Sequence, residues 1–319
     1  MNKIRQIIRK LLFEVHGKQV SIHNFSGEIT TDTMEVLRDN FEKMSNGREW
    51  KFAIEFKSPE NTIKDTNIDM IKIYVSFKFS NEFKIGGNFT PDKTILLDDD
   101  NYEVNINLKL ETNTIENLLP KIKSLISHEL NHAFVYIKDI GGKLKANLKN
   151  KSNKFTQMEL QHLFENNPSL KEFSKMIYLA NPYEVQAIVQ QSASELEHIN
   201  NKTPEETIES LLQYNPLRDA KIMMAYNLDE INKLDKEIIE IFVKKFNDNI
   251  KSFSKEDNPK TIYDINKFLE YWISIIHSSG HKLARKIYKL VADKHQIHEA
   301  YVYEQTSDNV YYRIFGEYY

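Results

Sequence analysis

The chain has 319 residues, of which 40% are hydrophobic and 11% aromatic, so it is long enough to bury one or two substantial cores. Its 43 Lys and Arg residues nearly balance 46 Asp and Glu residues, for a formal net charge of -3, and this balance argues against nucleic acid or an anionic membrane as the partner. Because the sequence contains no cysteine, disulfides, thiolate metal ligands and a cysteine nucleophile are excluded. Any metal chemistry must therefore use His, Asp or Glu.

The opening segment, residues 1–18, places its apolar side chains at helical spacing with basic residues between them. A signal peptide instead needs an uninterrupted apolar stretch followed by small residues. We therefore expect an amphipathic helix that packs on the protein, the alternative being one that docks on a membrane surface or an assembly. No stretch of the sequence approaches the roughly 20 apolar residues that a membrane span requires. We expect a soluble chain without a signal peptide.

The next segments predict one helix and then a sheet. Residues 31–44 predict a helix, with Thr31 or Asp32 as its cap. Between residues 51 and 110 the hydrophobic pattern changes to period two, which predicts a small, mostly antiparallel sheet. The predicted strands are KFAIEF (51–56), IKIYVSFKF (71–79), EFKIGGNF (82–89) and YEVNINLKL (102–110). Gly86-Gly87 predicts a bulge or turn, and the acidic stretch 98–101 predicts a solvated loop.

From about residue 114 onward the pattern is mainly helical. A proline in or near the first turn predicts helix starts after Asn181, Thr203 and Asn258. Residues 228–249 carry apolar side chains between charged ones in a pattern that predicts an amphipathic helix with one solvated face. The tyrosine-rich last 20 or so residues are compatible with a strand or with an irregular tail.

One short motif carries chemistry: His128-Glu129-Leu130-Asn131-His132 matches H-E-x-x-H. Side chains four residues apart lie on one face of an α-helix, so both imidazoles can bind one zinc ion. Glu129 is rotated one position from that face and reaches the water at the metal, where a carboxylate can accept a proton. The flanking apolar residues predict a helix buried against the sheet, with Pro120 near its start. With 10 histidines the match is moderately specific, and the alternative is a buried helix with structural histidines.

This motif, on a helix that follows a sheet, resembles the zincin metallopeptidases over roughly residues 51–200. The resemblance implies an α+β, zincin-like fold in which a small sheet lobe precedes a larger helical lobe, with the active-site helix between them. The boundaries are then 1–50 for an N-terminal helical segment, 51–140 for the sheet lobe with the H-E-x-x-H helix, and 141–319 for a helical lobe that carries the third metal ligand. Val135 and Lys138 stand where the metzincin extension needs a glycine and a ligand, so that subclass is excluded.

The gluzincin subclass takes its third ligand from a glutamate on a later helix, and YLANPYEVQAIVQQSASEL offers Glu184 with Ala187 one turn on. The resemblance thus implies His128, His132 and Glu184 as ligands of a Zn²⁺ cofactor. A local explanation competes with it. If Asn181 is the N-cap, Glu184 is at the third helical position and can fold back on the cap in a capping box. The other carboxylates that remain candidates are Glu159, Glu165, Glu172 and Glu195.

His277 and His281 repeat the four-residue spacing, but Gly280 between them predicts a helix end and no acid follows His277. A second metal site there is therefore the lesser interpretation. By resemblance to thermolysin-like enzymes, His277, His281 or a nearby tyrosine is a candidate donor to the oxyanion. We expect packing or surface positions for His162, His198, His295 and His298.

The resulting prediction is a zinc metallopeptidase in which Glu129 activates the water and then protonates the departing amine. An outward strand within residues 71–110 is expected to hold a peptide or protein substrate in extended form. The alternative is a structural or assembly protein of the phage virion type on a zincin scaffold, because the Asn-, Lys- and Ile-rich composition resembles many phage-encoded chains. We accordingly expect a cytoplasmic or virion-associated protein. A secreted toxin protease similar to the clostridial neurotoxin light chains is less favoured, since that resemblance ends with the motif.

Overall fold

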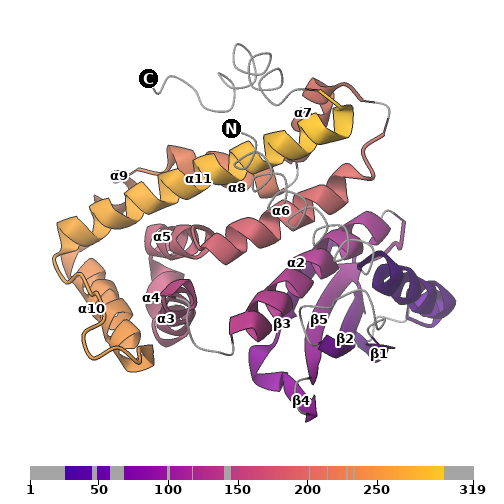
Figure 1. Cartoon of the computed structure of the whole chain (residues 1–319), viewed down its shortest axis with the longest axis horizontal. Helices are drawn as coiled ribbons and strands as arrows, with labels where there is room; N and C mark the ends of the chain where they lie inside the picture. The colour runs from indigo at the N-terminus through magenta and orange to yellow at the C-terminus, as the bar shows by residue number, and fades with distance from the viewer. Residues whose placement is uncertain are drawn as a thin grey trace, which may run out of the picture. The chain divides into compact units, whose positions relative to one another are not determined.

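The computed structural model (Figure 1) describes most of the chain between residues 26 and 297. The described ranges are 26–44, 49–57, 68–98, 101–116, 118–139, 145–200, 202–213, 215–227, 229–232 and 234–297. The helix expected at 1–18 and the tyrosine-rich end of the chain lie outside them. Two compact units are distinguished, Met1–Gly141 with Gln190–His198, and Gly142–Val189 with Ile199–Tyr319.

The first unit contains a helix over residues 26–44 and a five-stranded sheet. The strands are β1 (Glu49–Lys57), β2 (Ile68–Phe79), β3 (Lys84–Phe89), β4 (Ile95–Asp98) and β5 (Asn101–Thr112), with a short 3-10 helix, η1 (Pro91–Lys93), before β4. The sheet order is β1-β2-β5-β3, and β4 pairs with the other end of β5. The pairs β1–β2, β3–β5 and β4–β5 are antiparallel.

The central pair, β2–β5, is parallel, so the sheet is mixed, although most of its strand pairs are antiparallel as expected. Alternating hydrophobicity predicts where a strand lies but not the direction of its partner, since both kinds of pairing place successive side chains on opposite faces. The four predicted strands are present, whereas β4 is too short to have been distinguished from a loop.

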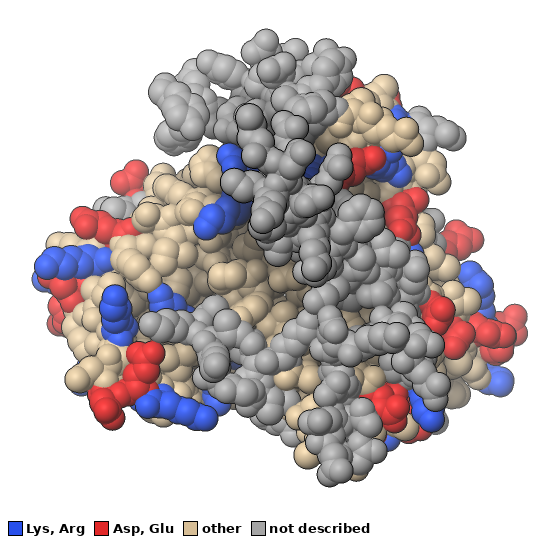
Figure 2. Space-filling model, viewed as in Figure 1, with Lys and Arg blue, Asp and Glu red and all other residues tan. Residues whose placement is uncertain are grey.

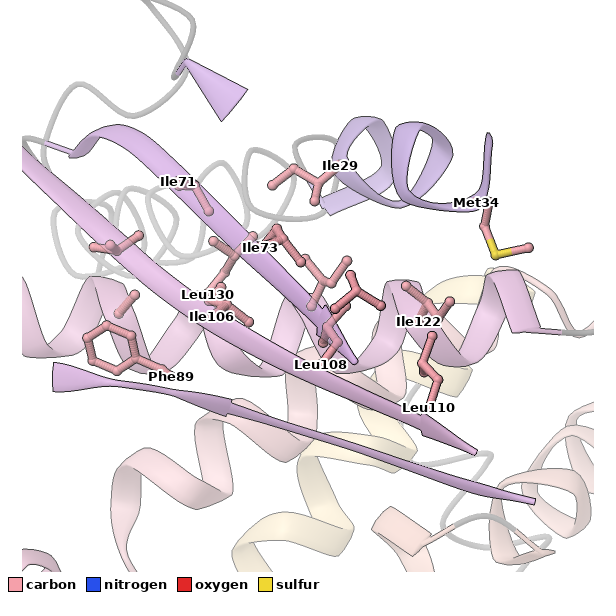
Figure 3. Packing of buried hydrophobic residues seen from close by; sticks show 14 of the residues in the cluster. Ile29, Met34, Ile71, Ile73, Phe89, Ile106, Leu108, Leu110, Ile122 and Leu130 are labelled. Atoms are coloured by element: carbon pink, nitrogen blue, oxygen red, sulfur yellow. The ribbon is translucent and has the colours of Figure 1, made fainter. Parts of the chain in front are cut away.

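One face of this sheet is the core of the first unit. In β2 the odd-numbered residues from Ile71 to Phe77 are fully buried, whereas Tyr74 between them is 40% exposed. In β5 the even-numbered residues from Val104 to Leu110 are buried in the same way. These side chains form one buried cluster with Ile29 and Met34 of the helix over residues 26–44, and Figure 3 shows Ile71, Ile73, Ile106, Leu108 and Leu110 of this cluster. In β2 the burial has period two, as the sequence predicts, whereas in β5 the intervening Glu103 and Asn105 are buried as well.

Helix α2 (Leu118–Asp139) covers that core face and carries the H-E-x-x-H motif. Ile122, Ile126, Leu130 and Ala133 are fully buried, at the i, i+4 and i+3 spacing of one helix face. Pro120 lies in the first turn, where proline is tolerated because the first amides have no partner inside the helix. The predicted buried helix is thus present, and its motif lies well inside it.

The remaining elements are helices, so the chain as a whole is of the mixed α+β class. They are α3 (Lys145–Glu159), α4 (Gln161–Asn166), α5 (Pro168–Leu179), α6 (Pro182–Leu196), α7 (Pro204–Gln213), α8 (Asn215–Ala225), α9 (Asp229–Asn232), α10 (Lys236–Phe253) and α11 (Ile265–His295). An aromatic cluster forms much of the core of the second unit: Phe173 of α5 and Phe242 of α10 are 6.0 Å apart, and both contact Phe268 of α11.

Several predicted helix ends are wrong. The helix predicted at 31–44 begins earlier, and Thr31 lies inside it, where its hydroxyl donates to the Gly27 carbonyl instead of capping. Asn258-Pro259 does not start a helix, because α11 begins at Ile265 and Asp264 caps it by accepting from the Lys267 amide. The helix expected at 228–249 is interrupted before Asp235, which caps α10.

Gly280 does not end a helix either, since α11 continues through it to His295. A Cβ atom at this position would lie 2.9–3.1 Å from Met223, Met224 and the Ala220 carbonyl of α8. Glycine is required here because two helices approach closely, which a single sequence cannot distinguish from a helix stop.

Charged side chains of both signs are interspersed over the face seen in Figure 2. This distribution agrees with the near balance of acidic and basic residues in the sequence. Among the described helices, none is both long enough and apolar enough to cross a membrane.

Candidate metal centre

Two histidines of α2 point to the same place. His128 and His132 are half-buried, and their rings are 4.8 Å apart at an interplanar angle of 74°. Their Nε2 atoms are 3.1 Å apart. The four-residue spacing places both rings one turn apart on one helix face, as the motif predicts.

This spacing fits a shared metal ion. Zinc–nitrogen bonds of about 2.0–2.1 Å at a tetrahedral angle place two ligand nitrogens about 3.3–3.4 Å apart. The observed 3.1 Å between the Nε2 atoms is close to that value and needs only a small opening. The same distance also suits a hydrogen bond between two neutral imidazoles of opposite tautomers.

Glu184 lies in the first turn of α6 and is 2% exposed. The Asn181 side chain caps this helix by accepting from the Tyr183 amide at 2.9 Å, as the sequence predicts. The Asn181 backbone amide, which a capping box would direct to Glu184, donates to the Tyr178 carbonyl at 3.0 Å. The side chain and the backbone amide of Asn181 therefore both take part in ordering the start of α6.

The ligand atoms of His128, His132 and Glu184 all lie within 4.8 Å of one another. Two imidazoles and a carboxylate form the donor set of many zinc hydrolases, which leave a fourth position for water. Within the part of the chain that the structure describes, no second group of three such side chains converges. The structure thus brings together the three residues that were expected as metal ligands.

The second half of α6 contacts α2 through polar side chains inside the first unit. Ser127 lies 2.8 Å from Ser194, and its hydroxyl donates to Ser26 at 2.7 Å. One turn earlier, the Ser124 hydroxyl donates to the Glu195 carboxylate at 3.0 Å. Burial raises the pKa of Glu195, opposed by this hydrogen bond and one from Gln191. These contacts hold the segment Gln190–His198 against α2 within the first unit.

Glu129 is buried and lies outside the three-residue group. Its Oε2 atom accepts a hydrogen bond of 2.6 Å from the backbone amide of Phe89, the last residue of β3. Sequence reasoning missed this contact, because a backbone donor has no signature in the amino-acid sequence. Glu129 is therefore held by the sheet, while its neighbours in the motif face each other.

The competing carboxylates have other partners. Glu159 bonds to Asn249 and Lys245, and the Asn249 amide and Lys245 ammonium groups lower its pKa. Glu165 accepts from Gln161, and Glu195 contacts α2 as described above. The fourth alternative, Glu172, is half-buried on α5 and is not part of the converging group.

Two of the other histidines contact groups within the second unit. His277 Nε2 contacts the Tyr226 carbonyl at 2.5 Å, and His295 Nε2 is 3.0 Å from the Thr207 hydroxyl. Burial lowers the pKa of His281, and the nearby His277 contributes. His162 and His198 are exposed, as expected, and His298 lies outside the described residues.

In comparisons with known proteins, no family model, no curated protein and no solved structure matches the chain significantly.

Proposed function

We propose that the chain is a zinc-dependent peptidase in which His128, His132 and Glu184 hold the metal and Glu129 transfers protons. The observation that carries the proposal is the convergence of the three ligand atoms within 4.8 Å. A hydrogen bond between the two rings accounts for the His128–His132 contact alone. A shared metal ion also accounts for the position of the Glu184 carboxylate, which is 2% exposed and has a ligand atom within 4.8 Å of those of both imidazoles.

When bound, a zinc ion supplies Lewis acidity that polarises a carbonyl group and acidifies water. The chain's own contribution is the carboxylate of Glu129, which adjoins His128 in the motif. Glu129 accepts a proton from the attacking water and donates it to the nitrogen of the departing amine, so one side chain performs both transfers. Burial of Glu129 at 6% exposure limits its contact with bulk water and keeps the transferred proton at the site.

The metal assignment is tested by measuring zinc in purified protein by elemental analysis. We expect one zinc per chain in the wild type and in Glu129→Ala, since Glu129 is not a ligand. His128→Ala should lose the metal. Glu184→Ala should lose zinc affinity by more than the roughly 10- to 100-fold that is typical when a residue supporting a ligand is replaced. His162→Ala removes an exposed imidazole and is the matched control. Zinc retained in His128→Ala would contradict the ligand assignment.

The peptidase assignment is tested with a peptide library. If the wild type cleaves peptides and Glu129→Gln does not, with zinc bound in both, the result supports the proposal.

The second candidate is an assembly protein that uses the same metal site for structure. The observation in its favour is three consecutive exposed apolar residues in β4, Ile95, Leu96 and Leu97, at 51%, 57% and 42% exposure, since exposed apolar patches mark interaction surfaces. Stoichiometric zinc without cleavage would favour this second function.

A further inference from the structure

Among the described strands, β3 lies at one edge of the sheet and pairs with β5 along its length. The Thr90 amide donates to the Asn105 carbonyl at 3.0 Å, and the register places Phe89 opposite Ile106. Hydrogen-bonded and non-hydrogen-bonded pairs alternate along an antiparallel ladder. The backbone amide of Phe89 therefore faces away from β5, toward the open edge.

That edge contacts one face of α2 at successive turns. A Cβ atom on Gly87 would lie 2.9 Å from Leu125, the Phe89 amide donates to Glu129 at 2.6 Å, and the Phe89 ring lies 5.5 Å from that of Tyr136. Leu125, Glu129 and Tyr136 are separated by four and seven residues, which is the spacing of one helix face. These contacts with Leu125 and Tyr136, on either side of Glu129 along α2, hold β3 next to the Glu129 carboxylate.

We infer that the backbone amide of Phe89 positions the carboxylate of Glu129 for proton transfer. This inference rests on the proposed function. A carboxylate on a flexible side chain can rotate, whereas an acceptor bond to a fixed amide restrains one of its two oxygens and the orientation of the whole group. The amide acts through Glu129 and does not itself touch the reacting atoms, so Phe89 is a positioning residue.

The amide contact is tested without any activity measurement, by hydrogen exchange of selectively labelled protein in NMR spectra. We expect exchange of the Phe89 amide to accelerate about tenfold or more in Glu129→Ala, the amount set by the loss of one hydrogen bond to a charged group. The Thr90 amide, which bonds to Asn105 inside the sheet, is the internal control and should change little. Equal exchange at Phe89 in wild type and Glu129→Ala would overturn the inference.

The positioning role is tested by removing the donor while the strand is kept. Proline removes the amide and is tolerated at sheet edges where the N–H faces outward, so Phe89→Pro is compared with Phe89→Leu, which keeps the amide. Ile85→Pro places the same substitution at another outward-facing position of β3 and is the proline control. All variants are first checked for bound zinc and for the circular dichroism of the wild type.

We expect kcat of Phe89→Pro to fall about tenfold to a hundredfold with KM changed less than about threefold, as for a lost charge-assisted hydrogen bond. Phe89→Leu and Ile85→Pro should keep kcat within about threefold. Equal losses in Phe89→Pro and Phe89→Leu, or a higher kcat in Phe89→Pro, would overturn the inference. A wild type that binds zinc but cleaves no peptide would refute the proposed function instead, and the exchange experiment would still decide whether Phe89 restrains Glu129.

Discussion

At the scale of single residues, two adjacent glycines in β3 have different roles. A Cβ atom on Gly87 would lie 2.9–3.2 Å from the branched end of Leu125, whereas one on Gly86 would meet nothing within 4 Å. We therefore predict that Gly87→Ala lowers the free energy of unfolding by about 1–3 kcal/mol through overpacking. Gly86→Ala should be neutral or stabilising by up to about 1 kcal/mol, because it restricts the unfolded chain. Urea unfolding measures both, and equal effects at the two positions would contradict the packing argument.

His128 and His132 could be selected from the sequence because helical spacing is local: they required only a four-residue interval on a helix. Glu184 was selected by the resemblance to the gluzincins, since no local pattern relates it to the H-E-x-x-H motif. The Phe89 amide could not be predicted, since every non-proline residue has such a donor and only the fold determines which one meets Glu129. The contact between Ser127 and Ser194 could not be predicted for a similar reason, because a serine in the sequence does not indicate which residue it will contact.

At the scale of elements, α7 begins with a reciprocal cap. The Thr203 hydroxyl accepts from the Glu206 amide at 3.2 Å, and the Glu206 carboxylate accepts from the Thr203 amide at 2.8 Å. We predict that Thr203→Ala costs about 1 kcal/mol of stability, because it leaves an amide of the first turn without its acceptor. Thr203→Ser keeps the hydroxyl and should cost only a few tenths of that. Chemical unfolding of both variants tests the cap, and identical losses would show that the methyl group matters instead.

A second prediction at this scale concerns α6, whose Glu195 is bonded to Ser124 of α2. Burial raises the pKa of Glu195 above its ordinary 4.5, so the folded state binds a proton more tightly than the unfolded chain. The ionised form weakens the fold at neutral pH, and stability is regained as pH falls through the raised pKa towards 4.5. We predict that Glu195→Gln is more stable than the wild type at pH 7 and that the difference shrinks towards pH 4.5.

Thermal unfolding at several pH values measures this effect. Glu197→Gln is the matched control, because Glu197 is exposed, 45% for its side chain, and pairs with Lys123, an interaction that contributes little at a surface. The same pH dependence in wild type and Glu195→Gln would show that Glu195 does not titrate with folding.

Predictions of helices and strands succeeded where side-chain periodicity determines the answer, as in β2 and α2. They failed where the answer depends on a distant partner. Gly280 lies inside α11 because α8 approaches it, and the direction of β2 relative to β5 depends on how the intervening chain crosses the sheet. Asn258-Pro259 has the composition of a helix start, but Asp264 supplies the cap that is used.

At the scale of the whole molecule, the sequence predicted an α+β chain with a sheet before a series of helices, and the described residues follow this order. The compact units are less simple, because Gln190–His198, which begins within α6, belongs with the sheet although α3, α4 and α5 precede it in the chain. Such a return depends on side chains far apart in sequence, including Ser124 and Glu195. Hydrophobic patterning alone does not contain that information.

At the same scale, removal of the metal should lower the stability of the folded chain. An ion that binds only the folded state stabilises it by about 2.7 kcal/mol when its free concentration is 100 times its dissociation constant. We therefore expect zinc to raise the melting temperature of chelator-treated wild type by several degrees, and to do the same for Glu129→Ala, whose substituted side chain is outside the converging group. The rise should be much smaller in Glu184→Ala and absent in His128→Ala. Calorimetry with and without zinc measures these shifts, and a rise in His128→Ala equal to that of the wild type would place the stabilising ion at another site.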